Sequence, residues 1–190
     1  MCILYRLIAN DLVAQTGKEK MMKILALDID GVLTTSESVW NSHLQSHEFN
    51  ADCVKRLKQI IAETQCQILV TSSWRFRGER WIKGFFKKSG IDVLDLTNDL
   101  GRQGRGAEIR EWVARNPSVT AVVAVDDDWF VGVPLVQTSW SEGLTDSVMS
   151  DLIRLLNQQN NILRKTMDLS ERHKVRNHCR RIRLSFSNCK

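Results

Sequence analysis

The chain has 190 residues, of which 43% are hydrophobic and 26% charged, an ordinary composition for a globular protein. A chain of this length is expected to form one domain with tails. Its apolar stretches are too short to cross a bilayer, which excludes a membrane-spanning protein. The five cysteines show no paired spacing, which argues against a disulfide framework or a zinc site and predicts a cytoplasmic location.

The net charge of +5 is unevenly distributed along the chain. Residues 164–190 contain nine Lys/Arg and two Asp/Glu, a net charge of +7, so the preceding 163 residues carry a net charge of −2. We therefore divide the chain into an N-terminal extension (1–22), a domain (23–163) and a basic C-terminal tail (164–190). The tail is either a solvated extension, which we favour, or a segment that follows nucleic-acid phosphates.

Strand-like and helix-like segments alternate through the domain, which predicts a doubly wound, Rossmann-like α/β fold with a mainly parallel five-stranded sheet. Strands are expected over residues 24–27, 66–70, 92–96, 119–125 and about 133–137. Helices are expected after the N-cap Asn50, over about 78–89, through 108–113 and after Thr145. The helix over 78–89 is expected to bury Trp81 and Phe85, and residues 34–48 to form a polar connection.

The most informative feature is the apolar run that ends in Asp28-Ile29-Asp30-Gly31. The run predicts a buried strand, and the carboxyl ends of strands in open α/β sheets gather ligands. Alternate residues of an extended segment point the same way, so Asp28 and Asp30 can face one site. Two carboxylates so close are costly unless a cation or a shared proton neutralises them, which points to a divalent cation and phosphoryl chemistry.

Polar residues follow two other predicted strands. Thr71 and Ser72 follow the second strand, and Asp126-Asp127 follow the fourth. Arginines 102 and 105 lie in a glycine-punctuated loop before a helix. Because the carboxyl ends of parallel strands lie at one edge of a sheet, these hydroxyl, carboxylate and guanidinium groups are expected to converge there.

This order of motifs resembles the haloacid dehalogenase (HAD)-like superfamily of phosphohydrolases. The residues that carry the resemblance are Asp28-Ile29-Asp30-Gly31-Val32, Thr71, an arginine before the third helix and Asp126-Asp127, within about 23–158. Three further segments resemble the small HAD-like domains found alone or fused to RNA-repair enzymes. They are Val70-Thr71-Ser72-Ser73-Trp74-Arg75, Arg105-Gly106-x-Glu108-Ile109 and Gly143-Leu144-Thr145.

The resemblance implies a role for each matched residue. Asp28 would attack phosphorus to form an aspartyl-phosphate, and Asp30 would act as general acid and then general base. Thr71 would hydrogen-bond a phosphoryl oxygen, and Arg105 or Arg102 would neutralise its charge. Magnesium would be held by Asp28, the backbone carbonyl of Asp30 and Asp126, with Asp127 acting directly or through water.

Several neighbouring residues have more than one candidate role. Ser72, Arg75 and Arg102 are candidate substrate-binding residues, although Arg75 has an equally good alternative in pairing with a carboxylate. Tryptophans 74, 81 and 112 are expected in the core rather than as base-stacking platforms. His43 and His47 are expected to be surface residues of the polar connection.

Spacing leaves no room for the cap domain that many superfamily members insert between these motifs. Only 43 positions separate Asp28 from Thr71, and 34 separate Thr71 from Arg105. Because caps close over small substrates, a capless site suits a bulky one. The sequence therefore predicts a magnesium-dependent phosphatase that acts on a phosphorylated macromolecule. The favoured substrate is the terminal phosphate of a polynucleotide. The alternatives are a phosphoprotein phosphatase, a phosphotransferase and a non-catalytic module that binds nucleic acid through its tail. The sequence does not indicate an oligomeric state.

Overall fold

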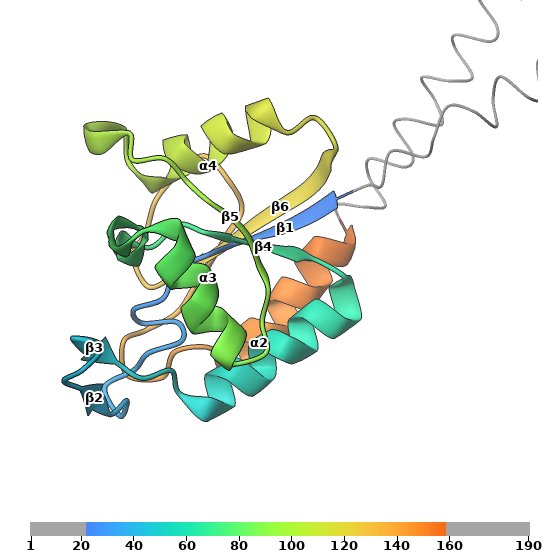
Figure 1. Ribbon diagram of the computed structural model, residues 1–190. Helices are drawn as coiled ribbons and strands as arrows, with labels where there is room; N and C mark the ends of the chain where they lie inside the picture. The colour runs from blue at the N-terminus through green and yellow to red at the C-terminus, as the bar shows by residue number, and fades with distance from the viewer. Residues whose placement is uncertain (1–21, 159–190) are drawn as a thin grey trace, which may run out of the picture.

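The computed structural model describes residues 22–158 and contains one five-stranded parallel sheet in the order β5-β4-β1-β6-β7. The strands are β1 (Met22–Leu27), β4 (Gln67–Val70), β5 (Val93–Leu96), β6 (Val119–Asp126) and β7 (Leu135–Gln137). One face of the sheet is covered by α2 (Ala51–Thr64), α3 (Glu79–Lys88) and a helix over residues 146–158. The other face is covered by α4 (Arg105–Arg115) (Figure 1). The predicted fold class is confirmed. Met22, which was expected in the extension, is the first residue of β1, and the rest of the extension and the basic tail lie outside the described residues.

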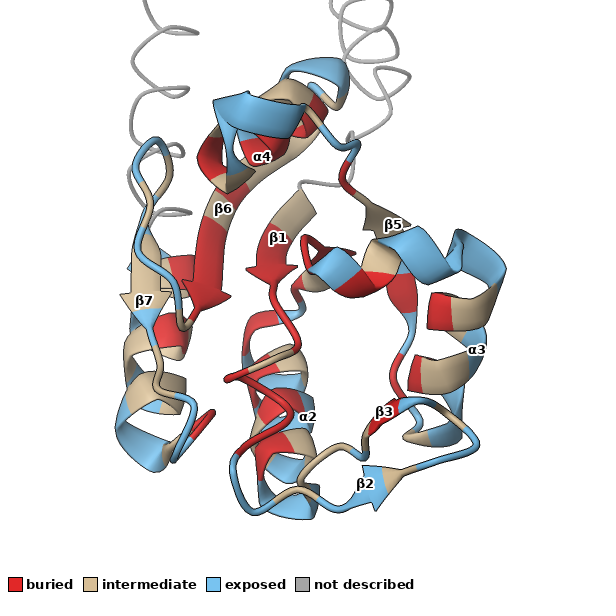
Figure 2. Cartoon of the chain, turned by 90° about the vertical axis from the view of Figure 1, so that its left-hand side faces the viewer, coloured by how far each residue is buried: buried red, intermediate tan, exposed pale blue. Residues whose placement is uncertain are grey.

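The two faces of β1 show why the sheet is covered on both sides. Leu25 and Leu27 pack with side chains of α2, α3 and the helix over 146–158, whereas Ile24 and Ala26 pack on the other face with Trp112 and Ile109 of α4. Because successive side chains of a strand point to opposite faces, a strand buried on both faces must be apolar throughout. All four of these β1 side chains are fully buried, so the apolar run forms the centre of the fold (Figure 2).

The helix termini explain several boundaries. The Asn50 side chain accepts hydrogen bonds from the backbone N–H groups of Asp52 and Cys53, as expected of the N-cap of α2. The Thr145 hydroxyl accepts from the Val148 N–H at the start of the last helix. Just before it, Gly143 has a φ of +62°, and a Cβ there would lie 2.7 Å from Thr35 Cγ2. A glycine is therefore required where this turn packs against the loop after β1.

The structure corrects two sequence-based expectations. Helix α3 fully buries Ile82 and Phe86, while Trp81 and Phe85 are only partly buried against the same core. These four positions form one apolar stripe, and its centre lies one residue later than expected. The expected core positions of Trp74 and Trp112 are confirmed.

The second correction concerns residues 34–48, which are more than a polar connection. They contain an antiparallel hairpin formed by β2 (Trp40–Asn41) and β3 (Ser46–His47), with Trp40 opposite His47. The hairpin lies beyond the carboxyl ends of the sheet strands (Figure 2). It is too small to be a cap domain, and the described residues contain none. Within residues 22–158, no helix is both long and apolar enough to span a membrane.

Candidate active site

The site is centred on Asp28, which follows the last residue of β1. Its backbone N–H donates to the Val125 carbonyl of β6 at 3.1 Å, which continues the pairing of the two strands and fixes the position of the side chain. Only 4% of Asp28 is exposed. Burial raises the pKa of its carboxyl to about 6, the Arg105 guanidinium opposes this rise, and the nearby Asp126 adds to it.

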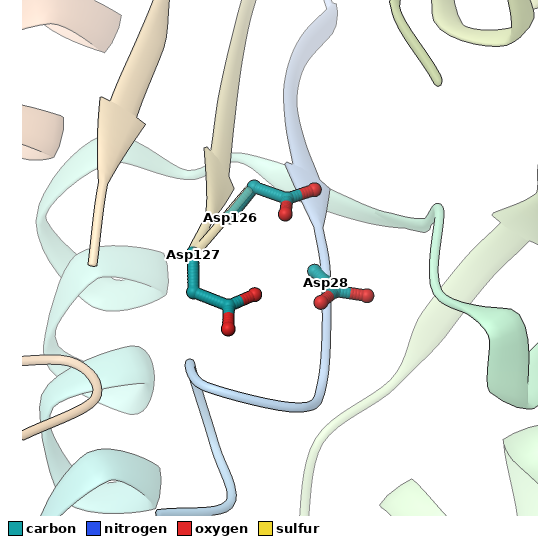
Figure 3. A group of neighbouring side chains, drawn as sticks. All are labelled: Asp28, Asp126 and Asp127. Carbon is teal, nitrogen blue, oxygen red and sulfur yellow. The ribbon is translucent and has the colours of Figure 1, made fainter. Parts of the chain in front are cut away.

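Two further carboxylates come from the end of the neighbouring strand. Asp126 ends β6 and is fully buried, and Asp127 follows it. One carboxylate oxygen from each of Asp28, Asp126 and Asp127 lies within 4.8 Å of the others (Figure 3). Burial also raises the pKa values of Asp126 and Asp127, and proximity to other carboxylates raises them further. Like charges gathered in this way call for a cation.

The donor set fits a hard divalent cation such as Mg²⁺. All three side chains offer oxygen, the ligand type that this ion prefers. The buried Oδ1 of Asp28 makes no hydrogen bond among the described residues, although the Arg105 guanidinium forms an ion pair with it at 3.3 Å. This oxygen therefore keeps lone-pair capacity for a metal ion. The loop after β1 leaves room for Asp127 because residue 31 is glycine with a φ of +69°. A Cβ there would lie 2.3 Å from Asp127 Oδ2.

Arg105 is the arginine that the fold brings to these carboxylates. Its Nη1 lies 3.3 Å from Asp28 Oδ1 and donates to Asp126 Oδ2. Gly106 makes this approach sterically feasible, because a Cβ there would lie 1.9 Å from the Val131 carbonyl oxygen. Arg102, by contrast, is exposed in the short helix η2 (Gly101–Gln103). The geometry favours Arg105 for the third motif, and the role of each arginine toward substrate stays a prediction.

Asp30 lies beside the metal-binding candidates without joining them. Its Oδ1 accepts a hydrogen bond from Thr34 Oγ1 at 3.0 Å, and its Oδ2 accepts one from Trp74 Nε1 at 2.8 Å. Its carboxylate is not part of the three-oxygen group, so any metal contact would use its backbone carbonyl, as expected from the resemblance. Two donors thus hold the candidate general acid in one orientation while leaving it available for proton transfer.

Thr71 and Ser72 follow β4 and reach the same edge of the sheet. The Thr71 N–H donates to the Leu27 carbonyl at 2.9 Å, and both residues are buried. The Ser72 side chain helps to lower the pKa of Asp28 against the effect of burial. Ser72 also caps the short helix η1 (Ser73–Arg77) by accepting from the Trp74 N–H.

Arg75 is engaged by protein groups. Its Nη2 lies 2.9 Å from Glu108 Oε1 and 3.6 Å from Asp99 Oδ1, and its Nη1 donates to the Thr71 carbonyl. The pairing with a carboxylate, which the sequence left as the alternative, is therefore present. A substrate contact stays a prediction. Arg75 and the buried Glu108 support the segment that presents Thr71 to the site.

Sequence reasoning missed three supporting residues. Thr34 and Trp74 orient Asp30, and Glu108 pairs with Arg75. A signal existed only for Glu108, which precedes Trp112 by four positions and therefore shares the buried face of α4. A buried acid on that face requires a cationic partner.

A sequence profile for the family described as "HAD domain in Swiss Army Knife RNA repair proteins" matches residues 24–149. The comparison with curated protein sequences found no match.

Solved structures show only distant likeness to this chain. A hypothetical protein from Xanthomonas campestris has 15% identity and a TM-score of 0.45, covering 77% of this chain and 90% of its own. The 3-deoxy-D-manno-octulosonate 8-phosphate phosphatase from Moraxella catarrhalis, solved with magnesium, phosphate and the sugar acid, has 14% identity and a TM-score of 0.45, covering 80% and 94%. The cobalt-bound form of the corresponding Haemophilus influenzae enzyme has 14% identity and a TM-score of 0.41, covering 75% and 91%. Likeness at this level carries no argument about activity.

The raised pKa of Asp28 predicts a cost in stability when no metal is bound. Because the folded pKa of about 6 exceeds the unfolded value of about 3.9, ionised Asp28 lowers the free energy of unfolding as the pH rises from about 4 to about 6. In chelator, Asp28→Asn should therefore stabilise the protein at pH 7 by on the order of 1 to 3 kcal/mol and have a much smaller effect at pH 4. Urea denaturation at the two pH values measures the difference.

The matched control is Asp92→Asn, since that side chain is almost fully exposed. Its effect should stay within about 0.5 kcal/mol at both pH values. An Asp28→Asn protein that is less stable than wild type at pH 7 in chelator would show that Asp28 is not held at a cost.

Proposed function

We propose that this chain, which belongs to the family of HAD domains in Swiss Army Knife RNA repair proteins, uses magnesium to remove a terminal phosphate from a polynucleotide. Its membership of the HAD superfamily makes it a phosphatase. Beyond this, we propose three features: dependence on magnesium, an aspartyl-phosphate intermediate and a nucleic-acid substrate.

One observation carries the proposal. The buried Asp28 has an oxygen without a hydrogen bond, the carboxylates of Asp126 and Asp127 lie close to it, and Arg105 pairs with both Asp28 and Asp126. A buried carboxylate held in this way is poorly suited to a structural role, because it raises the free energy of the folded state. It is well suited to a nucleophile whose charge is balanced only when metal and phosphate are bound.

The reaction would proceed in two displacements. In the first, a carboxylate oxygen of Asp28 bonds to phosphorus, the bond from phosphorus to the leaving oxygen breaks, and Asp30 gives that oxygen a proton. In the second, Asp30 takes a proton from water, the water oxygen bonds to phosphorus, and the Asp28–phosphorus bond breaks to release inorganic phosphate. Thr71 and Arg105 would hold the phosphoryl oxygens through both steps.

Together with Arg105, bound Mg²⁺ would neutralise Asp28, Asp126 and Asp127, and it would withdraw charge from the phosphoryl group. The raised pKa of each of these carboxyls supports this assignment, since each is held in surroundings that disfavour its ionised form. Metal binding would displace their protons, so magnesium affinity should fall as the pH falls below about 6.

The openness of the site supports a macromolecular substrate. Between Asp28 and Thr71 the chain adds only the β2–β3 hairpin, α2 and β4, so the strand ends are left without a covering domain. A phosphate at the end of a long polymer can reach such a site, whereas a small metabolite gains little from it. A nucleic-acid substrate is also consistent with the RNA-repair context printed for the family.

A substrate panel tests the proposal. Oligonucleotides carrying a 3′- or 5′-phosphate, free nucleotides and phosphopeptides are incubated with the full chain in magnesium or in chelator, and released phosphate is measured. We expect the highest kcat/KM on phosphorylated oligonucleotides, loss of turnover in chelator and recovery with magnesium. Asp28→Asn should lower turnover by at least about 1,000-fold, a barrier change of about 4 kcal/mol. Three other outcomes would contradict this assignment. Preference for phosphopeptides would indicate a phosphoprotein phosphatase, transfer of phosphate to an added alcohol in place of water would indicate a phosphotransferase, and nucleic-acid binding without turnover would indicate a non-catalytic module.

A second experiment tests the assignment of Asp30. A nitrophenyl group leaves without protonation and a sugar hydroxyl does not, so Asp30→Asn should reduce turnover far more on a nucleotide phosphate than on nitrophenyl phosphate. Trp74→Phe, which removes the donor at 2.8 Å but keeps the ring, should change turnover in the same sense by a smaller factor of about 5 to 30. Trp112→Phe is the matched control, because its indole N–H donates to Asp95, away from the site. Equal losses on the two esters would leave Asp30 with no role in proton transfer.

A further inference from the structure

A pocket of about 410 Å³ is lined in part by Asp30 and by none of the metal-binding candidates. The hairpin supplies Trp40, Gln45, Ser46 and His47 to its lining, helix η1 supplies Ser73, Trp74 and Arg77, and the loop after β7 supplies Trp140. Its volume lies within the range of small-molecule sites, and it combines aromatic surface with a few polar groups. The two displacements above use only Asp30 and its partner Trp74 from this lining.

Two of the lining tryptophans are unusually exposed. Trp40 is 55% exposed and Trp140 is 41% exposed, although most of the large apolar side chains in this domain are buried. His47 lies between them, with ring centroids 5.2 Å from Trp40 and 5.6 Å from Trp140, and contacts each edge-on. We call these three rings the aromatic rim. They leave indole surface exposed to solvent beside the site, and apolar surface left in water costs free energy unless a ligand covers it.

The hairpin that supplies two of these rings is held firmly against the site. The Arg77 guanidinium donates to the carbonyls of Leu44 and Gln45 at 2.5 and 2.6 Å. The same guanidinium lies over the rings of Trp74 and Trp81. Since Trp74 also donates to Asp30, the hairpin turn, η1 and the candidate general acid form one connected unit.

A polar group in the pocket lacks a partner. The Ser46 side-chain oxygen is buried and has no hydrogen-bond partner among the described residues, and Ser46 as a whole is only 5% exposed. A buried hydroxyl without a partner costs free energy. The Ser46 oxygen is enclosed in the wall of the pocket, so a ligand with a donor or acceptor recovers this free energy when the Ser46 hydroxyl turns toward the pocket. This second observation is independent of the aromatic rim and indicates a ligand with a polar edge.

The direction of the reaction determines which part of the substrate reaches this pocket. Asp30 gives its proton to the leaving oxygen, so the group attached to that oxygen lies on the Asp30 side of phosphorus. For a polynucleotide end, that group is the terminal sugar, and the sugar carries a base. A base has a stacking face and a hydrogen-bonding edge, which match the indoles and the hydroxyl.

We propose that the aromatic rim and Ser46 form a subsite for the base of the terminal nucleotide, which makes this phosphatase select nucleoside phosphates over other phosphate monoesters. This inference rests on the function proposed above and extends it to the part of the substrate beyond the phosphate. Base stacking on an aromatic side chain tolerates all bases, so the subsite recognises the presence of a base more than its identity.

The test compares two oligonucleotides that carry the same terminal phosphate, one with a normal terminal nucleotide and one with an abasic terminal sugar. Wild-type kcat/KM should be about 5- to 150-fold higher on the first, the range expected for one stacked base. Trp40→Ala and Trp140→Ala should each lose most of this preference, by slowing turnover of the normal end and leaving the abasic end nearly unchanged. Trp40→Phe should retain most of the preference, because it keeps an aromatic face.

Trp129→Ala is the control, since this tryptophan is 72% exposed in the loop after β6 and does not line the pocket. It should leave the preference intact, and thermal unfolding should show that all variants are folded. A wild-type enzyme that hydrolyses both ends equally, or a preference lost in Trp129→Ala and retained in Trp40→Ala, would overturn the subsite.

Glycerol phosphate separates this inference from the proposed function. Turnover of glycerol phosphate and of phosphopeptides that exceeds turnover of every oligonucleotide would remove the nucleic-acid substrate and the subsite with it. Efficient turnover of oligonucleotides without dependence on the terminal base would overturn the subsite alone.

Discussion

The site is organised around negative charge that gathers at the C-terminal ends of β1 and β6. The central strand and its neighbour are followed by carboxylates that lie close together, of which Asp28 and Asp126 are buried and Asp127 is partly buried. The pKa of each is raised because burial removes water and because the groups repel one another. Arg105 supplies one positive charge close to them, which is too little for three acids. This excess of negative charge is the reason for proposing that the site binds a divalent cation and, through it, a phosphoryl group.

Much of the surrounding structure serves to hold these charges in place. Glycine at 31 leaves space for the Asp127 carboxylate, and glycine at 106 lets α4 bring Arg105 to the strand ends. On the other side, Trp74 fixes Asp30 and is itself covered by Arg77, which also binds the hairpin turn. Electrostatic catalysis requires such groups to be oriented before the substrate arrives, and here backbone contacts and buried hydrogen bonds provide that orientation.

The sequence predicted those features that have a strong local signature. The apolar run ending at Asp28 defines a central strand, and Asn50 marks a helix start because its side chain can cap one. The hairpin at Trp40 to His47 was missed because its strands have two residues each, too few for a periodic pattern, and its position is held by Arg77 from a distant segment. The contact of Trp74 with Asp30 joins residues 44 positions apart and leaves no local trace. The burial of Trp81 was overestimated because the four apolar residues of α3 lie in one stripe, and the sequence does not show which of them face the middle of the core.

The central claim is that Asp28 forms a covalent bond to phosphorus, and trapping the aspartyl-phosphate tests this claim most directly. The full chain is mixed with magnesium and a 3′-phosphorylated oligonucleotide, quenched in acid during turnover, and digested for mass spectrometry. The account predicts an acyl phosphate on the Asp28 side chain that hydroxylamine removes, and none in Asp28→Asn. It also predicts more of this acyl phosphate in Asp30→Asn when an activated nitrophenyl ester is the donor, because the second step then lacks its base. Turnover without a phosphorylated Asp28, or a trapped phosphate on another residue, would contradict it.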